Sequence, residues 1–225
     1  MTQQAKKLVK RVSKTVKLDY LLYLPQSYGQ GGAKWPLIIF LHGAGERGAD
    51  LELVKVHGIP KIAEQQPDLL FVAVSPQCPE GSNWMEQLEA LDALYREITR
   101  TYAIDRERVY LTGLSMGGYG TWVWGAHNPR RFAALVPICG GAPPLSGFPE
   151  RIAVLKDVPI WAFHGAKDTV VPLAASQDLV SVLERVDGNV KFTIYPEAGH
   201  DAWTETYANP ELYTWLLAQR RSGRR

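Results

Sequence analysis

The chain has 225 residues, of which 46% are hydrophobic and 21% charged. These proportions are typical of a folded globular protein and exclude a disordered chain. The formal net charge of +2 indicates no charged partner, and the basic residues near both ends favour solvated surface over a nucleic-acid interface. No apolar run approaches the roughly 20 residues that span a bilayer, so we expect no membrane contact.

Cysteine usage and the first residues of the chain suggest a reducing compartment. Cys78 and Cys139 are too few for a disulfide framework and stand in no metal-ligand spacing, so we expect no metal and no cofactor. The first residues lack the apolar stretch of a secretory signal. We therefore expect a cytoplasmic monomer or weak homo-oligomer, with a secreted origin as the alternative.

Strand patterns occur from the start of the chain. Residues 8–12 and 15–24 alternate between apolar and polar side chains, which predicts antiparallel edge strands with one wet face. Short continuous apolar runs follow, typical of parallel strands buried on both faces; they cover residues 36–41, 69–74, 108–111, 133–138, 159–163 and 190–195.

Helical patterns separate these runs, at residues 51–66, 86–102, 116–128, 174–186 and 211–219. Alternating strands and helices with right-handed crossovers predict a mostly parallel, twisted α/β sheet with helices on both faces. No repeat or composition break divides the chain, so we expect one domain over residues 1–225. A ligand crevice is expected at the carboxyl ends of the strands.

The segment Gly113-Leu114-Ser115-Met116-Gly117 follows the apolar run at residues 109–111. A serine between glycines at a strand-to-helix turn is the pattern of a nucleophile elbow, where close packing leaves no room for larger side chains. Serine is a poor nucleophile on its own and needs a base and an orienting acid.

Two later loops supply candidates for these partners. Asp168 follows the run at 159–163 and is the candidate acid, although aspartate is also a common helix cap. His200 follows the run at 190–195 after Gly199 and is the candidate base. The chain order Ser115, Asp168, His200 favours these roles, whereas His57, His127 and His164 stand elsewhere in the order.

With these ordered motifs the chain resembles the α/β-hydrolases. Within them it is similar to small bacterial carboxylesterases of the dienelactone-hydrolase-like, feruloyl-esterase and "predicted peptidase" type. The residues that carry the closer match are Leu41-His42-Gly43-Ala44-Gly45-Glu46-Arg47-Gly48, Ser75-Pro76-Gln77-Cys78-Pro79 and Gly199-His200-Asp201-Ala202-Trp203. The resemblance implies a single-domain α/β-hydrolase fold and a serine hydrolase that cleaves small-molecule esters through an acyl-enzyme.

The expected mechanism needs donors for a negatively charged oxygen. By position these are the backbone N–H groups of Met116 and Ala44, with His42 bracing the loop. Gln77, Trp84 and Trp203 stand on loops at the sheet rim and are candidates for a substrate wall, with core packing as the alternative for the tryptophans. Glu46 is a further candidate for substrate binding, with plain solvation as its alternative.

The segment from residue 139 to 158 is the place where related folds carry a lid. Rich in Gly and Pro, it predicts a loop with one short helix at most, and therefore an open cleft for short-chain or small aromatic esters. Other activities remain open: a peptidase or a perhydrolase that uses the same three residues, or a non-catalytic binding module on this fold.

Overall fold

A seven-stranded sheet forms the centre of the computed structural model, which describes residues 7–10, 13–66, 68–144 and 147–221. The strand order is β1-β3-β2-β4-β5-β6-β7. β1 runs antiparallel to β3, and the other neighbours run parallel. The strands are β1 (Tyr20–Tyr23), β2 (Trp35–Leu41), β3 (Val72–Pro76), β4 (Ile104–Leu114), β5 (Ala134–Ile138), β6 (Ile160–Gly165) and β7 (Val190–Tyr195).

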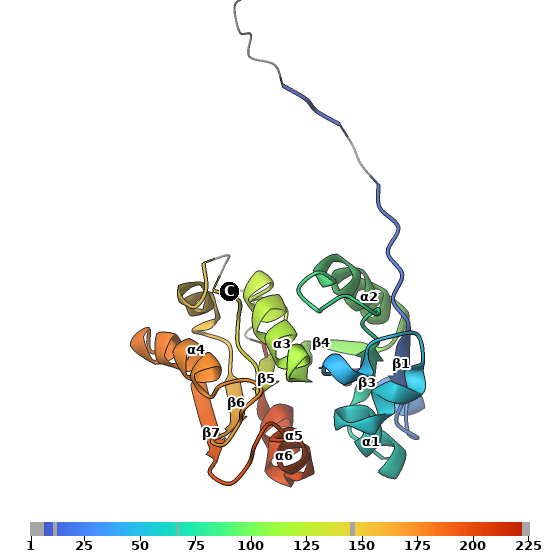
Figure 1. The fold of residues 1–225 in the computed structure, drawn as a ribbon. Helices are drawn as coiled ribbons and strands as arrows, with labels where there is room; N and C mark the ends of the chain where they lie inside the picture. The colour runs from blue at the N-terminus through green and yellow to red at the C-terminus, as the bar shows by residue number, and fades with distance from the viewer. Residues whose placement is uncertain (1–6, 11–12, 67, 145–146, 222–225) are drawn as a thin grey trace, which may run out of the picture.

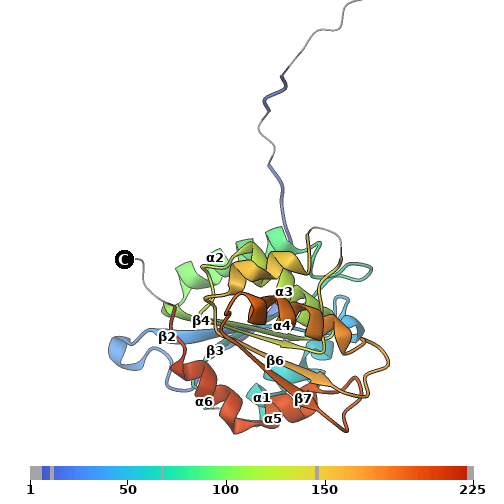
Figure 2. The ribbon, with the colours of Figure 1, turned by 90° about the vertical axis from the view of Figure 1, so that its left-hand side faces the viewer.

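Helices cover both faces of the sheet, as Figures 1 and 2 show. On one face lie α2 (Leu88–Thr101), α3 (Met116–His127) and α4 (Ala174–Arg185), and on the other lie α1 (Gly58–Gln65), α5 (Trp203–Ala208) and α6 (Pro210–Ala218). Four short 3₁₀ helices complete the described elements: η1 (Gln30–Gly32), η2 (Ala44–Glu46), η3 (Leu51–Val56) and η4 (Glu150–Leu155). This is the predicted α/β arrangement with helices on both faces.

Burial on both faces explains the continuous apolar runs of the parallel strands. In β2, Leu37 and Leu41 pack with Trp122 of α3 in one cluster, whereas Ile38 and Phe40 pack in the opposite cluster with Tyr207 of α5. Successive side chains of a strand point to opposite faces, so a strand covered on both sides needs apolar residues at every position. None of the helices in the described part of the chain is long and apolar enough to cross a membrane.

The N-terminal strands are shorter than the sequence predicts. Of residues 15–24 only Tyr20–Tyr23 pair with a neighbour, and residues 8–10 form no strand; residues 11 and 12 lie outside the described part. The chain before β1 extends away from the sheet in Figure 1. In this segment Lys14 donates a hydrogen bond to Glu89 of α2. An alternating pattern predicts which side chains face water, but it does not determine whether a neighbouring strand is present to pair with.

The helix predicted at residues 51–66 is two elements. His57 is extended, and Gly58 has a φ of 65°, which separates η3 from α1. A Cβ on Gly58 would collide with the ring of Phe40, so the chain bends where a glycine packs against β2. Helix α5, which the sequence pattern did not predict, begins directly after the loop of His200.

The segment after β5 forms a loop and η4. Ile152 and Leu155 of η4 are buried in the core beside α3 and α4, so this short helix is part of the body of the domain. Leu145 and Ser146 lie outside the described residues.

Candidate active site

Ser115 stands at a sharp turn between β4 and α3. Its φ of 52° and ψ of −118° lie in a region that residues with a Cβ rarely adopt. A Cβ on Gly113 would meet the backbone of Gly117, and one on Gly117 would meet the backbone carbonyl of Leu41. Because backbone atoms cannot move aside as a side-chain tip can, both glycines are needed for this packing.

Three residues that are far apart in sequence lie in a row, each within hydrogen-bond distance of the next: Ser115, His200 and Asp168. The Oγ of Ser115 is 2.9 Å from Nε2 of His200, and Nδ1 of His200 is 2.7 Å from Oδ2 of Asp168. A carboxylate can only accept, so Nδ1 donates to it, and in the neutral imidazole Nε2 then carries no proton. The Ser115 hydroxyl can then donate to Nε2, which is the arrangement of a nucleophile beside a base.

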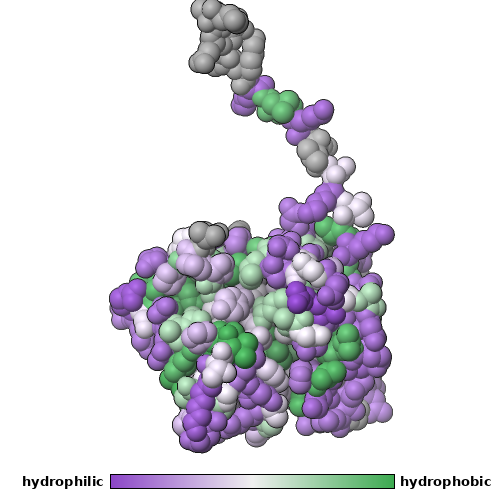
Figure 3. Space-filling view, viewed as in Figure 1, coloured by the Kyte–Doolittle hydropathy of each residue, from purple (hydrophilic) through white to green (hydrophobic). Residues whose placement is uncertain are grey.

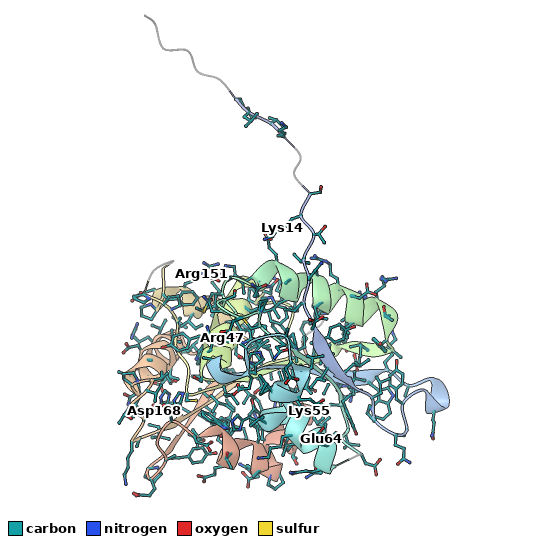
Figure 4. The ribbon with its side chains drawn as sticks, turned by 45° about the vertical axis from the view of Figure 1, so that its right-hand side comes forward. Lys14, Arg47, Lys55, Glu64, Arg151 and Asp168 are labelled. Atoms are coloured by element: carbon teal, nitrogen blue, oxygen red, sulfur yellow. The ribbon has the colours of Figure 1, made fainter. Side chains whose placement is uncertain are left out.

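Asp168, labelled in Figure 4, lies in the loop that follows β6, and backbone amides of the same loop hold its carboxylate. Its Oδ1 accepts hydrogen bonds from the backbone N–H groups of Val170 (2.8 Å) and Val171 (2.9 Å). Burial raises the pKa of Asp168, but the hydrogen bonds from His200 and from these two amides outweigh it and leave the pKa below its usual value. The carboxyl is therefore ionised at neutral pH.

A second histidine contacts this carboxylate. His164 of β6 is fully buried, and its Nε2 lies 3.2 Å from Oδ2 of Asp168. Chain order alone excludes His164 as the base, because it precedes the candidate acid Asp168 instead of following it. The signal that could have found it is its spacing, four residues before Asp168 at the end of a buried strand.

The loop after β2 brings backbone donors to the nucleophile. A Cβ on Gly43 would lie 3.7 Å from the Cβ of Ser115, so this loop passes directly over the serine. Ala44 and Met116 are the first residues of η2 and α3, and a first N–H has no carbonyl of its own helix to bind. Both amides are thus available near Ser115.

His42 ties the same loop to the core. The backbone N–H of Cys78 donates to its Nε2 (2.9 Å), and its ring packs edge-on against Trp84 at 5.0 Å. Burial lowers the pKa of His42 to about 4, so it is neutral near pH 7 and carries its proton on Nδ1. Its environment agrees with the bracing role expected for it.

Two of the four residues predicted to bind substrate are buried away from Ser115. Trp84 is fully buried and donates from Nε1 to the carbonyl of His42 (2.9 Å), so it belongs to the core. Gln77 is also buried, and its Nε2 donates to the carbonyls of Glu46 and Asp50 (both 2.8 Å). The prediction of a wall is wrong for both, because each has its polar group aimed at loop backbone instead of at the cleft.

Trp203 lies beside His200, whereas Glu46 lies on the loop after β2, beside His42. Oε2 of Glu46 is 3.8 Å from Nδ1 of His42, and it has no hydrogen-bond partner among the described residues. The partly buried ring of Trp203 contacts His200 edge-on with ring centres 5.3 Å apart, and on another side it contacts His57 at 5.4 Å. Trp203 therefore flanks the candidate base with an apolar face.

Cys139 also approaches this group. Candidate ligand atoms of Cys139, Asp168 and His200 lie within 4.8 Å of one another. The thiol is fully buried, and that burial raises its pKa well above the usual value. Nδ1 of His200 and Oδ2 of Asp168 are already joined by a hydrogen bond, which accounts for their proximity without a metal.

The open parallel sheet with a serine at the strand-to-helix turn defines the class of α/β-hydrolases. The chain belongs to the phospholipase/carboxylesterase family, whose pattern matches residues 72–209. Among solved structures, a thermostable esterase is 36% identical with a TM-score of 0.78, covering 92% of this chain and 60% of that one. The acylaminoacyl peptidase of Pyrococcus horikoshii, 18% identical with a TM-score of 0.69, shares the fold over 95% of this chain and 41% of its own.

Curated relatives are more distant. A putative carboxymethylenebutenolidase of Salmonella typhimurium is 30% identical over 100 residues, which are 43% of this chain and 37% of that protein. An acyl-protein thioesterase 1 homolog of Dictyostelium discoideum is 28% identical over 158 residues, 60% of this chain and 70% of that protein. The match thus spans little more than a third of the first of these relatives.

Proposed function

We propose that the chain is a carboxylesterase that hydrolyses small-molecule esters through an acyl-enzyme on Ser115. The observation that carries this proposal is the row of contacts from Ser115 Oγ to His200 Nε2 and from His200 Nδ1 to Asp168. Family membership supports the same conclusion, since the family is that of phospholipases and carboxylesterases.

In the first half of the reaction Ser115 is the nucleophile. Its Oγ attacks the ester carbonyl carbon while its proton passes to Nε2 of His200, the general base. Asp168 holds the imidazole in the required tautomer and stabilises the imidazolium that forms. The carbonyl oxygen gains the negative charge, and the backbone N–H groups of Ala44 and Met116 donate to it, each worth roughly 3 to 4 kcal/mol in comparable sites.

The second half returns the enzyme to its starting state. Collapse of the tetrahedral intermediate breaks the bond to the alcohol oxygen, which takes the proton from His200 as it leaves. Water then gives a proton to His200 and attacks the acyl carbonyl, and the acid departs as Ser115 regains its proton. No cofactor is needed for this sequence.

The proposed substrates are short-chain or small aromatic esters. Because η4 is buried in the core through Ile152 and Leu155, the segment after β5 supplies no large apolar cap. The face seen in Figure 1 carries its apolar side chains in separate small patches (Figure 3), unlike a broad surface for lipid droplets. Trp203 and Glu46 are the proposed substrate contacts, offering an aromatic face and a carboxylate.

Replacing Ser115 tests the proposal. In Ser115→Ala the attacking oxygen is lost, and we expect kcat on p-nitrophenyl acetate and methyl ferulate to fall by about 10⁴-fold or more. The matched control is Ser27→Ala, which alters an exposed serine on the loop after β1 and leaves the activity unchanged. Full activity of a folded Ser115→Ala protein would remove the proposal.

A further inference from the structure

Both ring nitrogens of His164 have protein partners within hydrogen-bond distance. Its Nε2 lies 2.9 Å from the carbonyl oxygen of Val171 and 3.2 Å from Oδ2 of Asp168. Its Nδ1 lies 2.8 Å from Oγ of Ser176 on α4, and that Oγ donates to the carbonyl of Gly140 at 2.6 Å. The side chains of His164 and Asp168 are fully buried, so water does not reach these contacts.

Counting protons in this chain of contacts gives the charge of the ring. A backbone carbonyl can only accept, so Nε2 must carry a proton for Val171. Ser176 has a single hydroxyl proton, and the 2.6 Å contact with the carbonyl of Gly140 requires it there. The Oγ of Ser176 therefore accepts from His164, which means that Nδ1 carries a proton as well.

We propose that His164 is a positioning residue for Asp168 and acts as a buried imidazolium, protonated on both ring nitrogens. Its role is to hold the carboxylate of the proposed triad in one rotamer and to offset its buried charge. Oδ1 of Asp168 is held by two backbone amides, and Oδ2 is shared between the imidazoles of His164 and His200.

The charges around Asp168 are consistent with this assignment. Within the described residues its ion-pair partners are the two histidines, and no lysine or arginine pairs with it. Among the described residues, Tyr119 of α3 and Cys139 after β5 interact electrostatically with Asp168, and burial raises the pKa of both. Both are neutral near pH 8, so His164 is the cation that offsets the buried carboxylate when His200 is neutral.

A pair of variants separates charge from hydrogen bonding. In His164→Gln the amide nitrogen can still donate toward Val171 and Asp168, but the charge is gone; in His164→Phe both are gone. This test rests on the proposed function, since it measures turnover. We expect kcat to fall by about 10-fold to 10²-fold in His164→Phe and by less in His164→Gln, with KM within twofold, because His164 does not touch substrate.

The pH profile of the reaction tests the positive charge of His164, because losing a purely structural side chain would not shift it. A cation near His200 disfavours a second positive charge there, so removing it makes the base easier to protonate. The acid limb of kcat/KM is expected to shift to higher pH by ~0.5 to 1 unit in both variants. An unchanged acid limb in both folded variants, or a rise in KM at constant kcat, overturns the proposal.

Nuclear magnetic resonance on the unsubstituted protein tests the charge without turnover, and so separately from the proposed function. The chain has five histidines, which can be labelled with ¹⁵N. At pH 8 we expect one ring with protons on both nitrogens, assigned to His164 by its loss in His164→Gln. Should that variant not fold, single His→Gln changes at the other four positions assign it by elimination. A bare ring nitrogen on His164 at pH 8 overturns the proposal.

Discussion

His42 makes a structural contact, and its pKa differs between the folded and the unfolded protein. Buried beside Trp84 and accepting from the N–H of Cys78, it is neutral in the folded protein down to about pH 4, where its pKa lies. In the unfolded chain a histidine takes up a proton near pH 6.5. Between these values the unfolded state binds more protons, so stability is lost as the pH falls through this window.

Replacing His42 by glutamine removes this pH dependence. The glutamine oxygen can still accept from Cys78, but it does not titrate. Between pH 7 and pH 4.5 we expect the free energy of unfolding to fall by up to roughly 3 kcal/mol more in the unsubstituted protein than in His42→Gln. Urea unfolding at both values measures the difference, and parallel losses in the two proteins would contradict this account of His42.

The proximity of site residues is predictable where chain order constrains it. Chain order and strand ends point to Ser115, Asp168 and His200, and the structure brings these three together. The predictions for Trp84 and Gln77 are wrong, because a position after a strand end does not reveal which backbone carbonyls a side chain binds. Trp84 binds the carbonyl of His42, and Gln77 binds those of Glu46 and Asp50. The contact between His164 and Asp168 depends on how the loop after β6 folds back, and their spacing of four residues is the sequence feature that could indicate it.

At the scale of elements, the turn of Ser115 depends on how closely α3 approaches the sheet. Gly117 in the first turn of α3 packs against the carbonyl of Leu41 in β2, and Gly113 packs against Gly117 itself. The turn that carries Ser115 and Met116 is therefore packed directly against the end of β2.

A methyl group at position 117 tests this packing. In Gly117→Ala the Cβ meets backbone, so we expect α3 to shift from β2, a loss of about 1 to 3 kcal/mol in stability and a severe loss of activity. Gly45→Ala is the matched control, because nothing lies within 4 Å of its Cβ. Equal thermal stability of the two variants would show that the approach of α3 is looser than described.

Elements were predictable where burial is two-sided. The runs at residues 36–41 and 133–138 agree closely with β2 and β5, because such strands must be apolar throughout. The break at Gly58 and the short helix α5 escaped prediction. The first depends on contact with Phe40, and the second has only six residues, too few for a clear helical period.

The whole molecule determines how much of a substrate the site can cover. Within the described residues the segment after β5 forms a loop and the buried helix η4, so the proposed site is an open one, with His200 partly exposed and Trp203 beside it. An ester with a long acyl chain would find little apolar surface to bury, since each buried CH₂ is worth about 0.8 kcal/mol only where a wall exists.

A series of p-nitrophenyl esters tests this openness. We expect kcat/KM to be highest for acetate or butyrate and to fall for chains of eight carbons or more, measured below the critical micelle concentration, in line with a site that lacks a large cap. Methyl ferulate in the same assay reports on small aromatic esters. A preference for the long chains would contradict the open site.

Covalent labelling tests the central claim, that Ser115 forms an acyl-enzyme. We predict that diisopropyl fluorophosphate inactivates the protein with one adduct per chain, and that mass spectrometry of the peptides places it on Ser115. His200→Ala, which lacks the base, should react far more slowly. Complete inactivation with the adduct on another residue, or full esterase activity in protein labelled at Ser115, would contradict the account.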